Sequence, residues 1–342
     1  MISEYKNYGE NFNQVLKAFK IKACCVAYKK IRNVMLYDVK LDAGTRVKEL
    51  QKYCDEISLA LKAKSKPIIR PMPEFGIVRF EVVEGIPEKL SFFEEYSKLG
   101  KMEGSVPMYL GSSIDGQNLE FDMAKNPHTL IAGCTGSGKS TLLHVLIANA
   151  LATKNVSVCV IDSKNVEFEP YKGIENVNVA NSFDEAIDLL NFVYGKMENR
   201  YSLITDYCLP SNYFTVAHDG YPQILFIIDE YADMVMQDKD RLFHNSVCKL
   251  AQKCRAAGIY CVLATQRPSV DIISGTIKAN FPGRISCQTV SGRDSKVILD
   301  STGAELLVGM GDSIIKNYKY NNQRFQMAYT TPEEVSNYYA RS

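Results

Sequence analysis

The chain has 342 residues, which is enough for two domains or for one large domain with an appendage. Hydrophobic residues make up 46% and charged residues 23% of it, as in soluble globular proteins, and no apolar stretch reaches the ~18 residues of a membrane helix, which excludes membrane insertion. The formal net charge of +1 excludes a chain that is basic throughout, so contact with nucleic acid requires a local patch or several copies around a ring.

The N-terminal part predicts a small α/β module. Strands are expected at 23–28, 34–41, 67–70 and 76–83, and helices at 47–61 and 88–97. Two short strands, 106–110 and 119–121, lead into a second domain. We therefore expect an N-terminal extension at 1–21, a small α/β domain at 22–104 and a larger domain at 105–342. The extension is interpreted as a short helix that docks on a partner or on a neighbouring subunit.

From residue 127 onward, apolar strands and helices alternate. Strands are expected at 128–132, 156–162, 224–229 and 259–265, and helices at 140–152, 184–203 and 241–257. Continuous apolar strands that alternate with helices predict an α/β fold with a mostly parallel sheet covered on both faces. Ligands bind at the carboxyl ends of such strands, and the motifs of this sequence fall there.

The loop after strand 128–132 matches the phosphate-binding pattern G-x-x-x-x-G-K-[ST] in full, between a strand and a helix, so a chance glycine turn carries little weight. Its glycines allow backbone N–H groups to face phosphate oxygens, and the helix N-terminus adds its dipole. Lys139 would supply a positive charge at the β- and γ-phosphates, and Ser140 a hydroxyl ligand for Mg²⁺. The expected ATP-binding residues are Gly133, Cys134, Thr135, Gly136, Ser137, Gly138, Lys139, Ser140 and Thr141.

Two carboxylates end the most apolar strand of the sequence. Asp229 is expected to hold Mg²⁺, commonly through water, and Glu230 to polarise the water that attacks the γ-phosphate. A strand capped by a solvated acidic pair is the plainer explanation. The position of the pair after Lys139 favours the nucleotide site, and the adjacent glutamate favours hydrolysis over nucleotide sensing alone.

Three further polar residues each have two interpretations. Gln266, at the tip of strand 259–265, can reach the γ-phosphate or its water, or it belongs to an ordinary turn. Arg255 closes the helix before that strand. It is either a cation at a helix C-terminus before the cap Gly258 or an arginine finger for a neighbouring subunit, and spacing alone favours the first. Arg200 has the same ambiguity.

With their flanking residues, these motifs resemble the motor domain of the FtsK/SpoIIIE family of DNA translocases, within the FtsK–HerA group. The most specific match is the run RAAGI at 255–259 followed by ATQRPSVD at 264–271, which continues through 277–280 and 294–300 to 309–312. Further matching segments lie at 127–140, 161–164, 197–201 and 228–233. The resemblance covers roughly residues 105–330, and the module around residues 39–47 is similar to the small α domain of the family.

The resemblance implies a RecA-like P-loop core that uses ATP and Mg²⁺, in a homo-oligomeric ring, usually a hexamer, around double-stranded DNA. ATP would bind between subunits, with Arg255 as the finger supplied in trans and Gln266 as the sensor. The implied pore residues would contact phosphates without sequence specificity, and they are Arg267, Lys278, Arg293 and Lys296. The segment 291–296 is one residue shorter than in typical members, which affects the placement of Arg293.

Three functions remain open. The first is an ATP-driven double-stranded DNA translocase, and it has the most support. Because no membrane region or C-terminal winged-helix module is found in the 342 residues, we expect a short cytoplasmic motor of a phage, plasmid or other mobile element. Ten cysteines without metal-ligand spacing fit reduced thiols in that compartment. The second function is a conjugation- or secretion-type coupling ATPase, and the third is a HerA-like ring that partners a nuclease.

Overall fold

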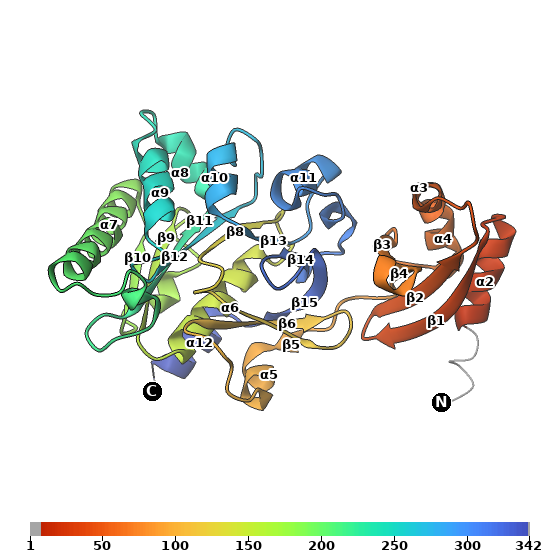
Figure 1. Ribbon diagram of the computed structural model, residues 1–342, viewed down its shortest axis with the longest axis horizontal. Coiled ribbons are helices and arrows are strands. Elements are labelled where there is room, and N and C mark those ends of the chain that lie inside the picture. The colour runs from red at the N-terminus through yellow and green to blue at the C-terminus, as the bar shows by residue number, and fades with distance from the viewer. Residues whose placement is uncertain (1–7, 341–342) are drawn as a thin grey trace. The chain divides into compact units, whose positions relative to one another are not determined.

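The computed structural model describes residues 8–340, which divide into two compact units. The first unit is formed by the chain up to Glu88 with the short segments Ile114–Gly116 and Leu306–Val308. The second contains Lys89–Ser113, Gln117–Glu305 and the chain from Gly309 onward. Figure 1 shows the course of the chain through both units. No helix within residues 8–340 is long and apolar enough to cross a membrane.

The first unit is a four-stranded antiparallel sheet with helices packed on it. Its strands are β1 (Ala23–Ile31), β2 (Val34–Leu41), β3 (Ile68–Met72) and β4 (Ile77–Val83), in the order β1-β2-β4-β3. The helix expected at 47–61 is interrupted by a 3₁₀ turn at Gln51–Tyr53, which leaves α3 (Val47–Leu50) and α4 (Cys54–Leu61).

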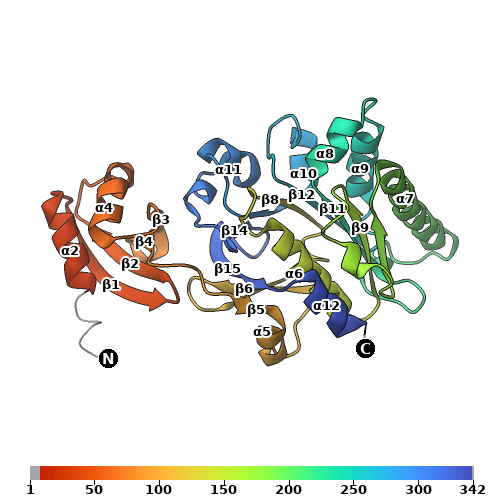
Figure 2. The ribbon, with the colours of Figure 1, turned by 180° about the vertical axis from the view of Figure 1, so that it is seen from behind.

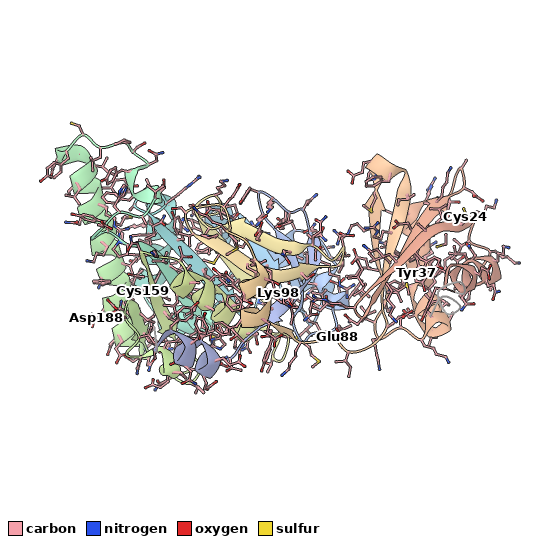
Figure 3. All side chains as sticks on the ribbon, turned by 90° about the horizontal axis from the view of Figure 1, so that it is seen from below. Cys24, Tyr37, Glu88, Lys98, Cys159 and Asp188 are labelled. Atoms are coloured by element: carbon pink, nitrogen blue, oxygen red, sulfur yellow. The ribbon has the colours of Figure 1, made fainter. Side chains whose placement is uncertain are left out.

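The helix α2 (Tyr8–Ala18) belongs to the core of the first unit. Phe12 on α2 stacks on Tyr37, which Figure 3 labels, with 4.3 Å between the ring centroids, and meets the edge of Phe80 at 5.3 Å. Residues 8–18 therefore bury their apolar face against their own sheet, and residues 1–7 of the expected extension lie outside the described part of the chain.

The second unit begins at Lys89, before the boundary expected at 104. The reason is local packing: β5 (Leu90–Ser91) pairs with a strand of the second unit, and α5 (Phe92–Lys98) stacks its aromatic side chains on the C-terminal helix of the same unit. Phe93 and Tyr338 are stacked with 4.6 Å between their ring centroids.

One mixed sheet of eleven strands organises the second unit. Besides β5, its strands are β6 (Pro107–Ser113), β7 (Asn118–Asp122), β8 (His128–Ala132), β9 (Val156–Asp162), β10 (Val177–Ala180), β11 (Gln223–Asp229), β12 (Ile259–Thr265), β13 (Gly283–Ser286), β14 (Asp312–Lys316) and β15 (Gln323–Tyr329). The order is β10-β9-β11-β12-β8-β13-β14-β15-β6-β7. The first six strands in this order are parallel, the next four join antiparallel, and β5 pairs in parallel with β15, which confirms the expected mostly parallel α/β core.

Helices cover both faces of this sheet, as Figures 1 and 2 show. The helices α6 (Lys139–Ala152) and α12 (Pro332–Tyr339) lie with α5 on one face, and the other face carries α7 (Phe183–Asp206), α8 (Tyr231–Gln237), α9 (Leu242–Lys253), α10 (Gly275–Asn280) and α11 (Gly292–Leu299). Most of α6 is buried, because it packs against β6, β9 and β15. Within α6, Asn149 accepts a hydrogen bond from the backbone N–H of Tyr109 at 2.8 Å and donates to its carbonyl at 2.8 Å.

The helix expected at 241–257 ends earlier, at Lys253. Gly258 follows in the left-handed region at φ +66°, and a side chain there would run into the carbonyl of Phe214. The chain therefore leaves the helix in a tight turn that contains Arg255, whose carbonyl accepts the N–H of Gly258 at 2.9 Å.

Candidate nucleotide site

The register of the parallel strands brings the sequence motifs to one edge of the sheet. Ala132 at the end of β8 pairs with Thr265 at the end of β12, and Asp229 at the end of β11 pairs with Asp162 at the end of β9. The loops that follow these strands therefore start side by side. They carry the phosphate-binding loop, the pair Asp229-Glu230, Gln266 and the loop after β9.

The phosphate-binding loop, residues 133–138, is hydrogen-bonded to two neighbouring segments, one after β13 and one before β14. Cys134 donates its N–H to the carbonyl of Gln288 at 2.8 Å, and Gly311 donates its N–H to the carbonyl of Ser137 at 3.0 Å. Gly138 has φ +107°, and a Cβ there would stand 3.0 Å from the backbone nitrogen of Gly311. Glycine is therefore required both by the backbone angle and by the close approach.

Lys139 and Asp229 form an ion pair inside the protein. The side chains are 3% and 1% exposed, and Lys139 Nζ donates to Asp229 Oδ1. Lys139 begins α6 and Asp229 ends β11, so the pair joins the two motifs that the sequence places about ninety residues apart. A buried amine and carboxylate that face each other are matched to a ligand with both a negative and a positive component, such as a phosphate with its cation.

The carboxylate of Glu230 is bound to the end of β12. Thr265 Oγ1 donates to Glu230 Oε1 at 2.7 Å, and the backbone N–H of Gln266 lies 3.0 and 3.1 Å from its two oxygens. Glu230 itself has φ +53°, a left-handed conformation that costs about 1–2 kcal/mol in a residue other than glycine. The hydrogen bonds to β12 hold the residue in that conformation.

Gln266, the residue expected as a sensor, lies beside the phosphate-binding loop. Its side-chain Oε1 accepts a hydrogen bond from Thr135 Oγ1 at 3.0 Å, while its backbone holds Glu230. Gln266 thus connects the loop on β8 to the carboxylate after β11.

Two polar residues of the site, Glu167 and His144, belong to none of the motifs identified in the sequence. Glu167 Oε1 lies 3.4 Å from the hydroxyl of Ser140, and its Oε2 lies 3.6 Å from His144 Nε2. The neighbouring His144 imidazole holds the pKa of the Glu167 carboxyl below its ordinary value. The family-like segment at 161–164 predicts a loop at this edge of the sheet. It does not include Glu167 or His144 and assigns neither of them a role.

The two arginines with ambiguous roles are in different environments. Arg200 is 3% exposed and donates to the carbonyls of Ala257 and Pro222, both at 2.5 Å, and its guanidinium lies 5.4 Å from the centre of the Phe214 ring. Burial lowers its pKa to about 10. Arg255 is exposed. Of the two, only Arg255 is available to another molecule.

The four cations expected to contact DNA lie in different environments. Arg267 is exposed directly after Gln266, and Arg293 and Lys296 are exposed on α11. Lys278 on α10 instead pairs with Asp300 at 2.6 Å. Asp300 also contacts Lys316 at 3.1 Å and Arg284 at 3.4 Å, two cations that the sequence analysis did not identify.

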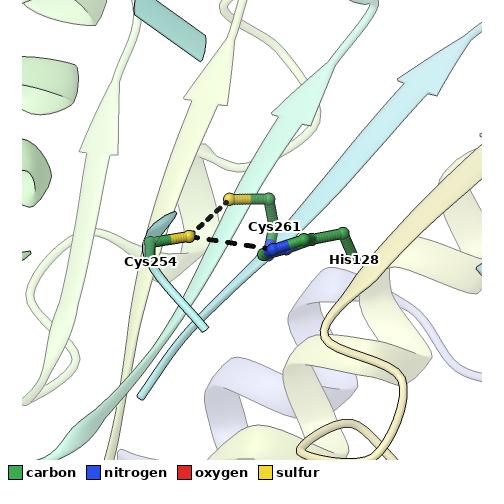
Figure 4. Close-up of side chains that lie close together, drawn as sticks. All are labelled: His128, Cys254 and Cys261. Atoms are coloured by element: carbon green, nitrogen blue, oxygen red, sulfur yellow. Dashed lines mark hydrogen bonds between the residues drawn. The ribbon is translucent and has the colours of Figure 1, made fainter. Parts of the chain in front are cut away.

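A second group of possible metal ligands lies at the opposite edge of the sheet. Cys254 Sγ is 3.7 Å from Cys261 Sγ and 3.9 Å from His128 Nε2, and all three side chains are buried (Figure 4). The backbone N–H of Cys261 lies 3.1 Å from both His128 Nδ1 and the carbonyl of Pro127. We interpret the group as a buried thiol–imidazole contact at the amino ends of β8 and β12.

The parallel core, the glycine loop before α6 and the buried lysine–aspartate pair define the class of this protein as a P-loop ATPase fold. The FtsK/SpoIIIE family model matches residues 94–211 and 215–270, and the FtsK alpha domain model matches residues 2–84. The chain belongs to the FtsK/SpoIIIE family, which confirms the resemblance seen in its motifs.

Curated relatives agree with this family. A protein named DNA translocase FtsK from Borreliella burgdorferi is 37% identical over 315 residues, which are 88% of this chain and 40% of the relative. The protein of the same name from Streptococcus pneumoniae is 35% identical over 325 residues, which are 89% of this chain and 42% of the relative. The chain thus spans less than half the length of these relatives.

Solved structures show the same fold. The conjugation coupling protein TcpA of pCW3, solved as a monomer with ATPγS, superposes with a TM-score of 0.67 at 20% identity, over 98% of this chain and 99% of that one. The cytoplasmic domain of the type VII secretion ATPase EccC from Thermomonospora curvata gives 0.60 at 22% identity, over 70% of this chain and 32% of that one.

The contacts of Arg200 predict a structural role. We expect Arg200→Ala to lower the free energy of unfolding by roughly 2–4 kcal/mol, because each buried carbonyl left without a donor costs about 1–3 kcal/mol. Arg255→Ala, in the adjacent turn, should change it by less than about 0.5 kcal/mol, as for an exposed side chain. Urea denaturation followed by circular dichroism measures both. Equal losses in the two variants would contradict this assignment.

Proposed function

We propose that this chain is the ATP-driven motor of a translocase that moves double-stranded DNA, without sequence preference, through a homo-oligomeric ring, usually a hexamer in its family. The observation that carries the proposal is the meeting of Lys139, Asp229 and Glu230 at one sheet edge in a chain of the FtsK/SpoIIIE family. The curated relatives named DNA translocase FtsK support DNA as the substrate.

ATP with Mg²⁺ fits the residues of this site. The γ-phosphate would replace Asp229 as the partner of Lys139, and Asp229 would then be free to hold Mg²⁺ together with the hydroxyl of Ser140. The cation supplies neutralisation of charge on the β- and γ-phosphates. Glu230 orients the attacking water, once its carboxylate turns from Thr265 toward the phosphate. Gln266 contacts the loop and senses the γ-phosphate from the neighbouring strand.

The place of Arg255 supports a role in a neighbouring subunit. It precedes β12, whereas the nucleotide loop lies beyond the carboxyl ends of the same strands. β12 has seven residues, so at about 3.3 Å per residue roughly 20 Å separate the two edges. Arg255 therefore cannot reach the nucleotide of its own chain, and its exposed guanidinium would serve the site of the next subunit in a ring.

A coupling ATPase of the conjugation or secretion type is the second candidate, because the folds of a conjugation coupling protein and of a type VII secretion ATPase superpose on this chain. Both candidates share the ATP site. A secretion-type ATPase that moves protein would differ from a DNA translocase because DNA would not stimulate its hydrolysis.

Substitutions at the nucleotide site should separate binding from hydrolysis. We expect Lys139→Ala to weaken ATP binding and abolish turnover, because the buried positive charge is lost. Glu230→Gln should bind ATP within about twofold of wild type and lose about 10²-fold or more in turnover, since a positioned acid–base group contributes about 10²–10⁴-fold. Calorimetric titration with ATPγS and a phosphate-release assay measure the two effects. Wild-type turnover in Glu230→Gln would remove Glu230 from this role.

The exposed cations predict stimulation of the ATPase by DNA. Double-stranded DNA of any sequence should stimulate hydrolysis, and binding should fall steeply with salt as counterions are released. The double variant Arg267→Ala/Lys296→Ala should keep basal turnover, lose most of the stimulation and show a salt slope smaller by about one for each phosphate that is no longer neutralised. The matched control, with the same change of charge, is Lys249→Ala/Lys253→Ala on α9. If DNA left the wild-type rate unchanged, the secretion-type candidate would be favoured.

The trans role of Arg255 predicts a failure of the conservative substitution. Arg255→Lys should fold and bind ATP normally yet lose about 10³-fold in turnover, because a compact ammonium replaces a planar guanidinium poorly. Mixing it with Lys139→Ala should restore part of the activity, since a Lys139→Ala subunit lends its intact Arg255 to a neighbour with an intact phosphate loop. Phosphate release from mixtures of the two variants measures this. A fully active Arg255→Lys protein would show that Arg255 only ends the turn.

A further inference from the structure

The loop after β9 places a third carboxylate beside the nucleotide site. Glu167 precedes the short 3₁₀ helix Glu169–Tyr171, and its Oε1 lies 3.4 Å from the hydroxyl of Ser140, to which it is the hydrogen-bond acceptor. Asp229 is engaged by Lys139, and Glu230 by Thr265. Within the described residues, Glu167 is therefore the carboxylate in contact with the expected Mg²⁺ ligand Ser140.

The backbone of the loop fixes the position of Glu167. The buried carboxylate of Asp162 accepts four backbone N–H groups within 3.0–3.1 Å, from Lys164, Asn165, Val166 and Phe168. These bonds curl the chain tightly over the end of β9. Phe168 and Tyr171 then anchor the loop, because both rings are fully buried in the core next to α6.

His144 fixes the carboxylate from the other side. It lies one helical turn after Ser140 on α6, so both side chains leave the same face of the helix. His144 Nδ1 is hydrogen-bonded to the hydroxyl of Tyr171 at 3.0 Å, and its Nε2 lies 3.6 Å from Glu167 Oε2. The two oxygens of Glu167 are thus directed to two residues of one helix face.

We propose that Glu167 is a positioning residue of the magnesium site, which holds the Ser140 hydroxyl in the orientation that a cation requires. A hydroxyl that ligates a cation through an oxygen lone pair must direct its O–H away from the metal, toward an acceptor. Glu167 is that acceptor. Residues that orient a metal ligand in this way typically change metal affinity about 10–100-fold when they are removed. The inference rests on the proposed binding of ATP with Mg²⁺ at this site.

The test compares nucleotide affinity with and without the cation. Calorimetric titration gives the Kd of ATPγS in Mg²⁺ and in EDTA for wild type, for Glu167→Ala and for the control Glu169→Ala. Glu169 lies on the same loop, but its carboxylate pairs with Lys172 at 2.8 Å. We expect Glu167→Ala to lose about tenfold or more of the affinity gained from Mg²⁺, with its Kd in EDTA within twofold of wild type. Glu169→Ala should match wild type in both conditions.

A second readout does not depend on hydrolysis. Binding of Mn²⁺ to the protein with ADP, followed by electron paramagnetic resonance, should weaken in Glu167→Ala by a similar factor, while the thermal unfolding temperature without nucleotide stays at the wild-type value. An unchanged gain from Mg²⁺ would overturn the proposal, and so would an equal loss of affinity in EDTA and in Mg²⁺. If wild-type affinity itself did not depend on Mg²⁺, the proposed ATP–magnesium function would fail, and this inference with it.

Discussion

The nucleotide site depends on the register between four parallel strands. Because β9, β11, β12 and β8 pair in parallel with their carboxyl ends level, four loops far apart in the sequence begin at one edge. A slip of one residue between β11 and β12 or between β12 and β8 would move the strand's side chains to the opposite face and would separate Lys139 from Asp229. These strands are apolar on both faces and are covered by helices on both sides, as is typical of parallel sheets.

Three consecutive residues at the end of β12 have different surroundings. Thr265 and the backbone of Gln266 hold the carboxylate of Glu230, the side chain of Gln266 contacts the phosphate-binding loop, and the next residue is the exposed Arg267. The backbone N–H of Arg267 also bonds to the hydroxyl of Thr265 at 3.0 Å. A displacement of Arg267 would therefore be transmitted through Thr265 to the carboxylate of Glu230, which is proposed to act in hydrolysis. Such a connection would couple contact with DNA to the hydrolysis of ATP.

Much of the core could be predicted from the sequence, because its signals are local. The strands 128–132, 156–162 and 259–265 have the expected bounds, since each is a short apolar run with motif residues at its end. Long-range contacts were beyond such reasoning. Glu167 is polar and lies in a loop, and only the fold brings it to Ser140. Arg200 and Arg255 are alike in sequence context, and burial alone separates them. The packing of α2 on Tyr37 also depends on tertiary structure that periodicity does not contain.

The glycine pair 138 and 311 has a mechanical consequence. Ser137 is tied to Gly311, and Gly311 in turn accepts the N–H of Met327 on β15 at 2.8 Å. Because glycine has no side chain, the backbone of the phosphate-binding loop contacts the backbone of the antiparallel half of the sheet directly. A rearrangement of the loop upon loss of the γ-phosphate must either break these bonds or carry β14 and β15 with it. Through these two hydrogen bonds, the antiparallel strands β14 and β15 are connected directly to the phosphate-binding loop.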